Sequence, residues 1–125
     1  MTVELSGIVV AGEGKASRLG FPTINIDYGR VAFPVDVGVY AGVLKHGAIA
    51  YRGVICVGPV RHSDRLKLEI HCFDHVPLHR GDTVVCTFYE QVSDFIRGDD
   101  NVMQQKIADD VKRAQEFFAS GYSGL

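Results

Sequence analysis

From Val3 to Glu90 the chain is a succession of short β-rich segments interrupted by glycine and proline, with no helical period of comparable length. Short antiparallel strands in so small a chain best remove their exposed edges by closing into a barrel. We therefore expect a closed or nearly closed β-barrel rather than an open sheet. The six predicted strands lie approximately at Val3–Val10, Phe21–Ile26, Val37–Lys45, Ala48–Val57, Arg65–Phe73 and Asp82–Gln91.

Two local patterns refine this expectation. His46-Gly47 separates the third and fourth segments, and glycine supplies the positive φ that a tight hairpin turn needs, so we expect a hairpin there. Apolar and polar residues alternate along the fifth segment, which in a strand puts them on opposite faces. The apolar set, expected to face the core, is Leu66, Leu68, Ile70 and Cys72, and the polar set, available for chemistry, is Lys67, Glu69 and His71.

The last quarter of the chain changes period and predicts one amphipathic helix over about residues 101–119. Asp99, Asp100 and Asn101 can cap its first N–H groups, and Gly121 is a suitable stop. We expect the apolar stripe to pack on the barrel; it comprises Met103, Ile107, Val111, Ala114 and Phe118. We expect the other side to be covered by Lys106, Asp109, Asp110, Lys112 and Arg113.

Size and charge narrow the class of protein. The chain has 125 residues, of which 46% are hydrophobic, enough for one core and too few for two ordinary domains. We expect a single domain over residues 1–125, with the barrel over about 3–97. The net charge is −2 and the cations are scattered, which argues against nucleic acid or an anionic membrane as partner. The expected partner is therefore a small molecule or another protein.

The three cysteines, Cys56, Cys72 and Cys86, form no C-x-x-C pair and lie in apolar runs, where a thiol packs as a small hydrophobe. That pattern suits a reducing compartment. The sequence shows no basic-then-apolar leader, and its apolar runs are too short for a membrane span. We expect a cytoplasmic protein, and a monomer, because a barrel covered by a helix has no evident need of a partner.

A glycine-rich loop, Ala11–Gly20, joins the first two predicted strands and carries three glycines, two cations and a hydroxyl. Such a loop can present backbone N–H groups and positive charge to phosphate oxygens. It lacks the Gly-Lys-Ser/Thr ending of a P-loop, and no helix follows to add its dipole. An ordinary hairpin loop is the alternative.

Thr23 and Asn25 follow in Phe21-Pro22-Thr23-Ile24-Asn25, and in a strand both side chains point the same way. Their hydroxyl and amide oxygens could complete the shell of a Mg²⁺ ion held mainly by nucleotide phosphates and water. The alternative is an edge strand with a solvated polar face.

Glu69 and His71 share a strand face, where a carboxylate could accept a proton from a substrate hydroxyl. A Glu-x-His pair could instead belong to a metal site, although two ligands without a third are weak evidence. A solvated strand face is the third possibility.

The order of these motifs resembles the riboflavin kinase family over nearly the whole chain. The matching elements are the glycine-rich basic loop, Leu19–Ile26, Gly38–Ala41, Leu68–His71, Phe95–Arg97 and the helix containing Gln105–Asp110. Leu19-Gly20-Phe21-Pro22-Thr23-x-Asn25 is the most specific of them. The resemblance implies a six-stranded antiparallel, Greek-key-like barrel with a C-terminal helix.

The resemblance also implies an activity and a site. Mg·ATP would phosphorylate the 5′-hydroxyl of riboflavin to give FMN, with Glu69 as catalytic base and Thr23 and Asn25 at the magnesium ion. Flavin would contact Phe95, Arg97 and Glu69. Nucleotide would contact Gly12, Gly14, Lys15, Ser17, Arg18, Gly20, Pro22 and Thr23.

Four stretches depart from the family pattern: Ala16-Ser17 replaces a glycine-arginine step, Gly58–His62 is altered, Arg80-Gly81 stands where tyrosine-glycine is expected, and Phe88–Arg97 is longer than usual. Two alternatives to an active kinase stay open, and the departures favour the first of them. One is a flavin- or nucleotide-binding relative with weak catalysis. The other is a small barrel that acts as a protein-interaction module, with the helix as its docking surface.

Overall fold

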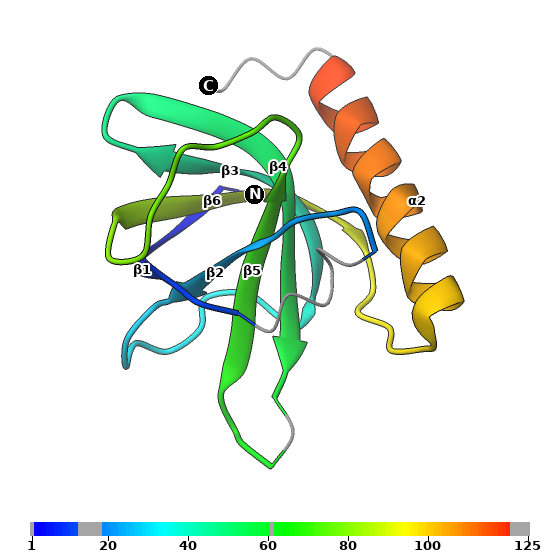
Figure 1. The fold of residues 1–125 in the computed structure, drawn as a ribbon, viewed down its shortest axis with the longest axis horizontal. Coiled ribbons are helices and arrows are strands. Elements are labelled where there is room, and N and C mark those ends of the chain that lie inside the picture. Colours follow the sequence, from blue (N-terminus) through cyan, green and yellow to red (C-terminus); the bar gives the residue numbers. More distant parts are fainter. Residues whose placement is uncertain (1, 13–18, 61, 121–125) are drawn as a thin grey trace.

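The computed structural model describes residues 2–12, 19–60 and 62–120, and these form six strands and one helix of 20 residues. Both kinds of element follow the predicted order, strands first and helix last (Figure 1). Their bounds are β1 Val3–Val10, β2 Ile24–Asp27, β3 Gly38–His46, β4 Ile49–Pro59, β5 Leu66–Cys72, β6 Thr83–Ser93 and α2 Asp100–Ala119.

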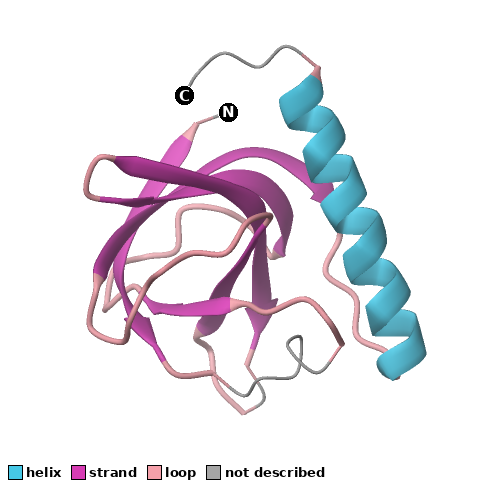
Figure 2. Ribbon diagram, turned by 45° about the horizontal axis from the view of Figure 1, so that its top comes forward, coloured by secondary structure: helices cyan, strands magenta, loops and turns pink. Residues whose placement is uncertain are grey.

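The strands form a closed barrel in the order β1-β2-β5-β4-β3-β6, with β6 returning to β1 and every pairing antiparallel. Each strand therefore has a partner on both sides, which removes the open edges that a sheet of this size would expose. Figure 2 shows the strands curling around a common centre while α2 lies along one side. The predicted six-stranded antiparallel barrel with a C-terminal helix is confirmed.

The apolar residues divide between the barrel interior and the space under α2, and β3 contributes to both. Tyr40 and Leu44 belong to the interior cluster, whereas Val39, Ala41 and Val43 belong to the cluster that includes Ala114 and Phe118 of α2. Because successive side chains of a strand alternate, a strand covered on both faces becomes buried along its length. Helix α2 is thus fixed to the barrel, as predicted from its apolar stripe.

The hairpin between β3 and β4 agrees with the prediction. His46 pairs with Ile49, and Gly47 in the turn has φ of +61°. The second strand differs, since it begins at Ile24 and leaves Phe21–Thr23 outside the ladder. Pro22 has no N–H to donate to a ladder, and its carbonyl accepts a hydrogen bond from a side chain of β5 instead.

Helix α2 begins as predicted, because the Asp99 side chain accepts a hydrogen bond from the Val102 N–H at 2.9 Å. Its C-cap is Ser120, and the predicted stop at Gly121 lies outside the described residues. In the described part of the chain, no helix combines the length and apolar character needed to cross a lipid bilayer.

The outer face assigned to the helix was partly wrong. Asp110 is only 4% exposed, and the Lys106 side chain is 15% exposed. The physical reason is their spacing, since position 110 lies between 107 and 114 on the buried stripe, and 106 lies one turn before 110. These two charged groups face the barrel and satisfy each other there.

Burial raises the pKa of Cys56, Cys72 and Cys86 from 9.0 to about 12, and the charges of Glu69 and Asp110 add to the rise at Cys56. At about pH 8 the folded protein should therefore react with iodoacetamide far more slowly than the guanidine-unfolded chain, because the thiolate is the nucleophile. Mass spectrometry of alkylated peptides measures this, and fast labelling of Cys86 in the native protein would contradict it.

The raised pKa values of the three thiols also predict how the free energy of unfolding depends on pH. The contribution of the thiols is fully present below pH 9 and is lost between pH 9 and about 12.

Candidate functional site

Two cavities adjoin each other on the barrel. The first, here the β2–β5 cavity, has a volume of about 820 Å³. Its walls come from the end of β1, from β2 and the turn after it, from the β4–β5 loop, and from β5. The lining residues are Val10, Ala11, Gly12, Asn25, Ile26, Asp27, Tyr28, Gly29, Arg30, Val60, Ser63, Arg65, Leu66, Lys67 and Leu68.

The second, here the helix-side cavity, has a volume of about 650 Å³ and lies between the barrel wall and the start of α2. Leu19, Phe95, Met103 and Ile107 are among its apolar lining residues, and Glu69 is among the polar ones. Volumes of this size accommodate a drug-sized ligand or a cofactor. The helix-side cavity therefore combines apolar contact area with a small number of polar groups, as ligand pockets usually do.

Thr23, Asn25 and Glu69 meet where the two cavities adjoin. The Thr23 hydroxyl donates to Glu69 Oε2 at 3.2 Å, and Asn25 is the register partner of Glu69 across β2 and β5. Thr23 and Glu69 line the helix-side cavity, whereas Asn25 lines the β2–β5 cavity. Three of the residues singled out from the sequence are thus brought together, although Thr23 precedes β2 rather than lying in it.

The Asn25 side chain is held tightly and is incompletely satisfied. Its Oδ1 atom is buried and has no hydrogen-bond partner among the described residues. Gly12 lies against the same side chain, since a Cβ at Gly12 would come within 1.9 Å of Asn25 Nδ2. A buried carbonyl oxygen without a donor costs free energy unless a ligand or ion satisfies it. The sequence assigned Gly12 to the nucleotide and Asn25 to the metal ion, and it did not predict this direct contact between them.

His71 fixes the segment before β2. Its Nδ1 lies 2.7 Å from the Pro22 carbonyl oxygen, and its ring meets Phe21 edge-on at 5.6 Å between centroids. Because a carbonyl can only accept, Nδ1 carries the proton of this hydrogen bond. Glu69 and His71 together therefore hold Pro22 and Thr23 from one face of β5.

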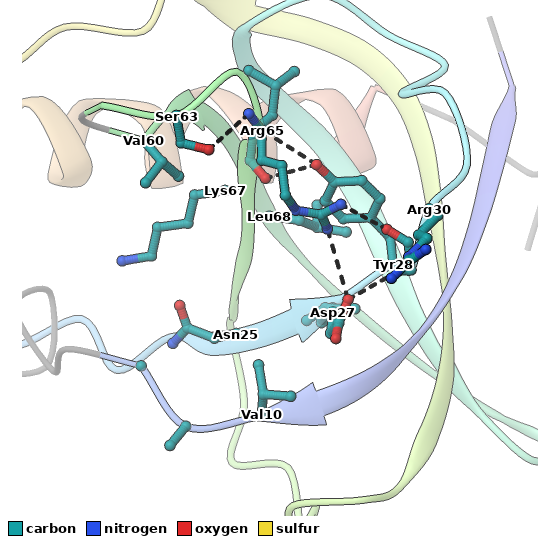
Figure 3. A pocket seen from close by; sticks show the side chains of 15 residues that line it. Val10, Asn25, Asp27, Tyr28, Arg30, Val60, Ser63, Arg65, Lys67 and Leu68 are labelled. Carbon is teal, nitrogen blue, oxygen red and sulfur yellow. Dashed lines mark hydrogen bonds and ion pairs between the residues drawn. The ribbon is translucent and has the colours of Figure 1, made fainter.

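The far wall of the β2–β5 cavity is built around Arg65, which Figure 3 shows beside Tyr28 and Asp27. Its guanidinium lies 4.6 Å from the centre of the Tyr28 ring and donates to the Gly29 carbonyl at 2.8 Å. The Tyr28 hydroxyl in turn donates to the Leu66 carbonyl at 2.8 Å. These contacts engage the cation with protein acceptors and give the cavity a fixed aromatic wall.

Phe95 and Arg97 form an arm over the end of β4. Phe95 packs so closely on Gly58 that a Cβ there would lie 2.4 Å from its ring. Arg97 donates to the Pro59 carbonyl, and its guanidinium lies 5.4 Å from the Phe95 ring centre. Both residues line the helix-side cavity together with Glu69, so the three residues predicted to contact flavin share one cavity.

The buried pair found in α2 also borders the helix-side cavity. Lys106 Nζ contacts Asp110 Oδ2 at 2.5 Å, and Ser93 Oγ donates to Asp110 Oδ1 at 2.6 Å. Two residues before Lys106, the Gln104 side chain donates to the Leu19 carbonyl at 3.1 Å. These bonds attach the start of α2 to β6 and to the end of the glycine-rich loop.

The remaining predicted residues lie elsewhere. Gly20 has φ of +94°, and Pro22 contributes its carbonyl to His71, but neither lines the two cavities. Gly14, Lys15, Ser17 and Arg18 lie outside the described residues. Sequence reasoning assigned no site role to Arg65, Tyr28 or Lys67. The alternation along β5 was the available signal for Lys67, because it puts Lys67 on the same face as Glu69.

The fold and these cavities define a small β-barrel with two adjoining cavities. The family model described as Flavokinase, riboflavin kinase, matches residues 1–118, so the chain belongs to the riboflavin kinase family. No curated protein matches the chain.

Among solved structures, the chain resembles a macrolide-efflux protein from Streptococcus pneumoniae, with a TM-score of 0.75 and 23% identity. The match covers 96% of this chain and 39% of that one, so this chain spans well under half of its length. At this identity the likeness shows the fold alone.

Proposed function

We propose that the protein is a riboflavin kinase that transfers the γ-phosphate of Mg·ATP to the 5′-hydroxyl of riboflavin, giving FMN and ADP. The observation that carries the proposal is the meeting of Thr23, Asn25 and Glu69 where two cavities adjoin. Phosphoryl transfer needs two bound substrates, neutralised phosphate charge and a positioned hydroxyl. Membership of the riboflavin kinase family supports the same assignment.

The two substrates would occupy different cavities. The isoalloxazine ring suits the helix-side cavity, whose walls include Phe95, Met103 and Ile107. The nucleotide suits the β2–β5 cavity, which Gly12 and Asn25 border and whose far wall carries the Arg65 guanidinium over the Tyr28 ring. This division would bring the reacting hydroxyl and the γ-phosphate together where Glu69 of one cavity pairs with Asn25 of the other.

The side chains at this boundary fit a magnesium ion. Asn25 Oδ1 is a buried oxygen that receives no hydrogen bond from the described residues, and the Thr23 hydroxyl has lone pairs beyond the bond that it donates to Glu69. Oxygen donors of this kind are those that Mg²⁺ takes from proteins alongside phosphate and water. When bound, the ion would neutralise charge on the phosphate oxygens.

Glu69 would act as the general base. Its carboxylate accepts the proton of the riboflavin 5′-hydroxyl, the hydroxyl oxygen forms its bond to the γ-phosphorus, and the bond from that phosphorus to the β,γ-bridging oxygen of ATP breaks. The proton passes from Glu69 to solvent after FMN and ADP have formed. Thr23 donates to Glu69 in the structure and so orients the carboxylate, while His71 holds the preceding carbonyl in place.

Chromatography of a reaction containing purified protein, riboflavin, Mg²⁺ and ATP tests the activity directly. We expect FMN to accumulate, and to be absent when ATP or protein is omitted. Riboflavin or FMN binding without any FMN formation would refute the kinase and favour a weakly catalytic relative.

A protein-interaction module is disfavoured by the packing of α2, because Val111, Ala114 and Phe118 of its apolar stripe pack on the barrel. The other two stripe residues, Met103 and Ile107, line the helix-side cavity. A ligand that binds only the folded state raises the melting temperature by mass action. We therefore expect FMN with ADP to raise the melting temperature. If no flavin or nucleotide shifts it, the hypothesis of a protein-interaction module would be favoured instead.

Thr23→Val should raise the concentrations of Mg²⁺ and ATP needed for half-maximal rate about 10-fold, because valine keeps the shape of threonine and removes the oxygen. Riboflavin affinity should change little. Steady-state kinetics with varied Mg²⁺ measures the effect, and Thr87→Val is a control, since Thr87 is buried in β6 away from both cavities. Unchanged nucleotide and metal dependence would remove Thr23 from the metal site.

A further inference from the structure

Lys67 is the residue that borders both cavities on the reactive face of β5. It lines the β2–β5 cavity and the helix-side cavity, and Val60 is the other residue that these two linings share. Lys67 lies two residues before Glu69, so both side chains leave the strand on the same face. We propose that the Lys67 ammonium binds the phosphoryl group in transfer, first as the γ-phosphate of ATP and then as the phosphate of FMN.

The surroundings of Lys67 support a ligand role rather than a structural one. Within the described residues, its ammonium forms neither a salt bridge nor a hydrogen bond to a protein acceptor, although the residue is half-buried. Of the four other lysine and arginine residues of the two linings, three are engaged: Arg65 with Gly29, Arg97 with Pro59 and Lys106 with Asp110. The fourth, Arg30, lies on the turn after β2 and lines the β2–β5 cavity alone, whereas Lys67 borders both cavities.

The direction of the side chain agrees with this role. Figure 3 shows Lys67 and Asn25 extending toward the same side of the β2–β5 cavity, away from Arg65 and Tyr28. Asn25 is also the register partner of Glu69. A cation, an amide oxygen and a carboxylate are therefore grouped at the boundary of the cavities, where phosphate charge and the attacking hydroxyl must meet.

The chemistry at that point calls for a cation. Charge on the transferred group is spread over its oxygens during phosphoryl transfer, and a positioned ammonium stabilises it. Lysine is a compact point charge on a flexible stem, so one ammonium can follow the phosphoryl group from nucleotide to flavin. The inference rests on the proposed kinase function, but it makes a separate prediction about binding.

The test compares two flavins that differ by the phosphate. Lys67→Met should weaken the binding of FMN about 10- to 100-fold and leave the affinity for riboflavin unchanged, as measured by quenching of flavin fluorescence. Lys67→Arg should retain most of the FMN affinity. Lys45→Met is the matched control, because Lys45 is an exposed lysine on β3 that lines neither cavity.

The outcomes separate the two proposals. If the wild-type protein makes no FMN, the proposed kinase function is refuted. If the wild-type protein makes FMN but Lys67→Met keeps the wild-type ratio of FMN affinity to riboflavin affinity, only the proposed role of Lys67 is refuted. An equal loss of affinity for FMN and riboflavin would also overturn the inference, because it would indicate a change in the shape of the cavity. A melting temperature close to that of the wild type confirms that Lys67→Met is folded, and Lys67→Gln replaces it if it is not.

Discussion

Glu69→Gln is expected to lower the rate of FMN formation about 10²- to 10⁴-fold, the contribution that a general base typically makes. Glutamine keeps the size of glutamate and can still accept a hydrogen bond from the Thr23 hydroxyl. It cannot take the proton of the riboflavin hydroxyl. The effect should therefore lie in kcat, with riboflavin and ATP affinities close to those of the wild-type protein.

Single-turnover kinetics with saturating riboflavin and Mg·ATP measures this loss without interference from product release. Glu90→Gln is the control, because Glu90 is an exposed glutamate on β6 that lines neither cavity. A full rate in Glu69→Gln would mean that another group or water removes the proton. A rate lost only through weaker flavin binding would assign Glu69 to substrate positioning instead.

The polar face of β5 was predictable because its spacing is a local property. A strand alternates its side chains whatever surrounds it, so the apolar character of Leu68 and Ile70 predicted that Glu69 lies on the opposite face. Leu68 and Ile70 are indeed buried in the structure. Closure of the barrel was predictable for a similar reason, since short strands leave edges that must be paired. The family motifs then connected Thr23 and Asn25 to Glu69, and the registers of β2 and β5 bring them together.

Contacts between distant segments were not predictable in the same way. Asp110 is a charged residue on a helix, and its burial depends on Lys106 and Ser93, the second of which comes from β6. Sequence composition favours an exposed position for such a carboxylate unless its partners are known. The late start of β2 at Ile24 likewise involves His71, which lies 49 positions from the Pro22 carbonyl that it binds.

The cavities escaped prediction because their walls combine loops whose relative positions only the closed barrel fixes. Val60 and Ser63 come from the β4–β5 loop, whereas Gly12 follows β1, and all of them line one cavity. The side chain of Lys67 could be assigned to a face from its spacing. That this face lies between two cavities could not.

Gly12→Ala is expected to reduce kcat/KM for ATP about 10²-fold, the size of effect that a displacement near 1 Å produces in a catalytic group. A Cβ at Gly12 would lie 1.9 Å from Asn25 Nδ2 and 2.8 Å from Oδ1, so the Asn25 side chain must move. Its buried oxygen would then leave the position from which it could meet magnesium. Riboflavin affinity should be unchanged, because neither Gly12 nor Asn25 lines the helix-side cavity.

A double-mutant cycle attributes the Gly12 effect to this one contact. Asn25→Ala removes the side chain that the added methyl group meets, so Gly12→Ala on that background should cause little further loss of kcat/KM or of melting temperature. The single variants and the double variant are compared by ATP titration at fixed riboflavin and by thermal unfolding. Additive losses would show that Gly12 acts independently of Asn25, through the backbone of the glycine-rich loop, and the assignment of Asn25 as the oxygen donor would lose its strongest structural support.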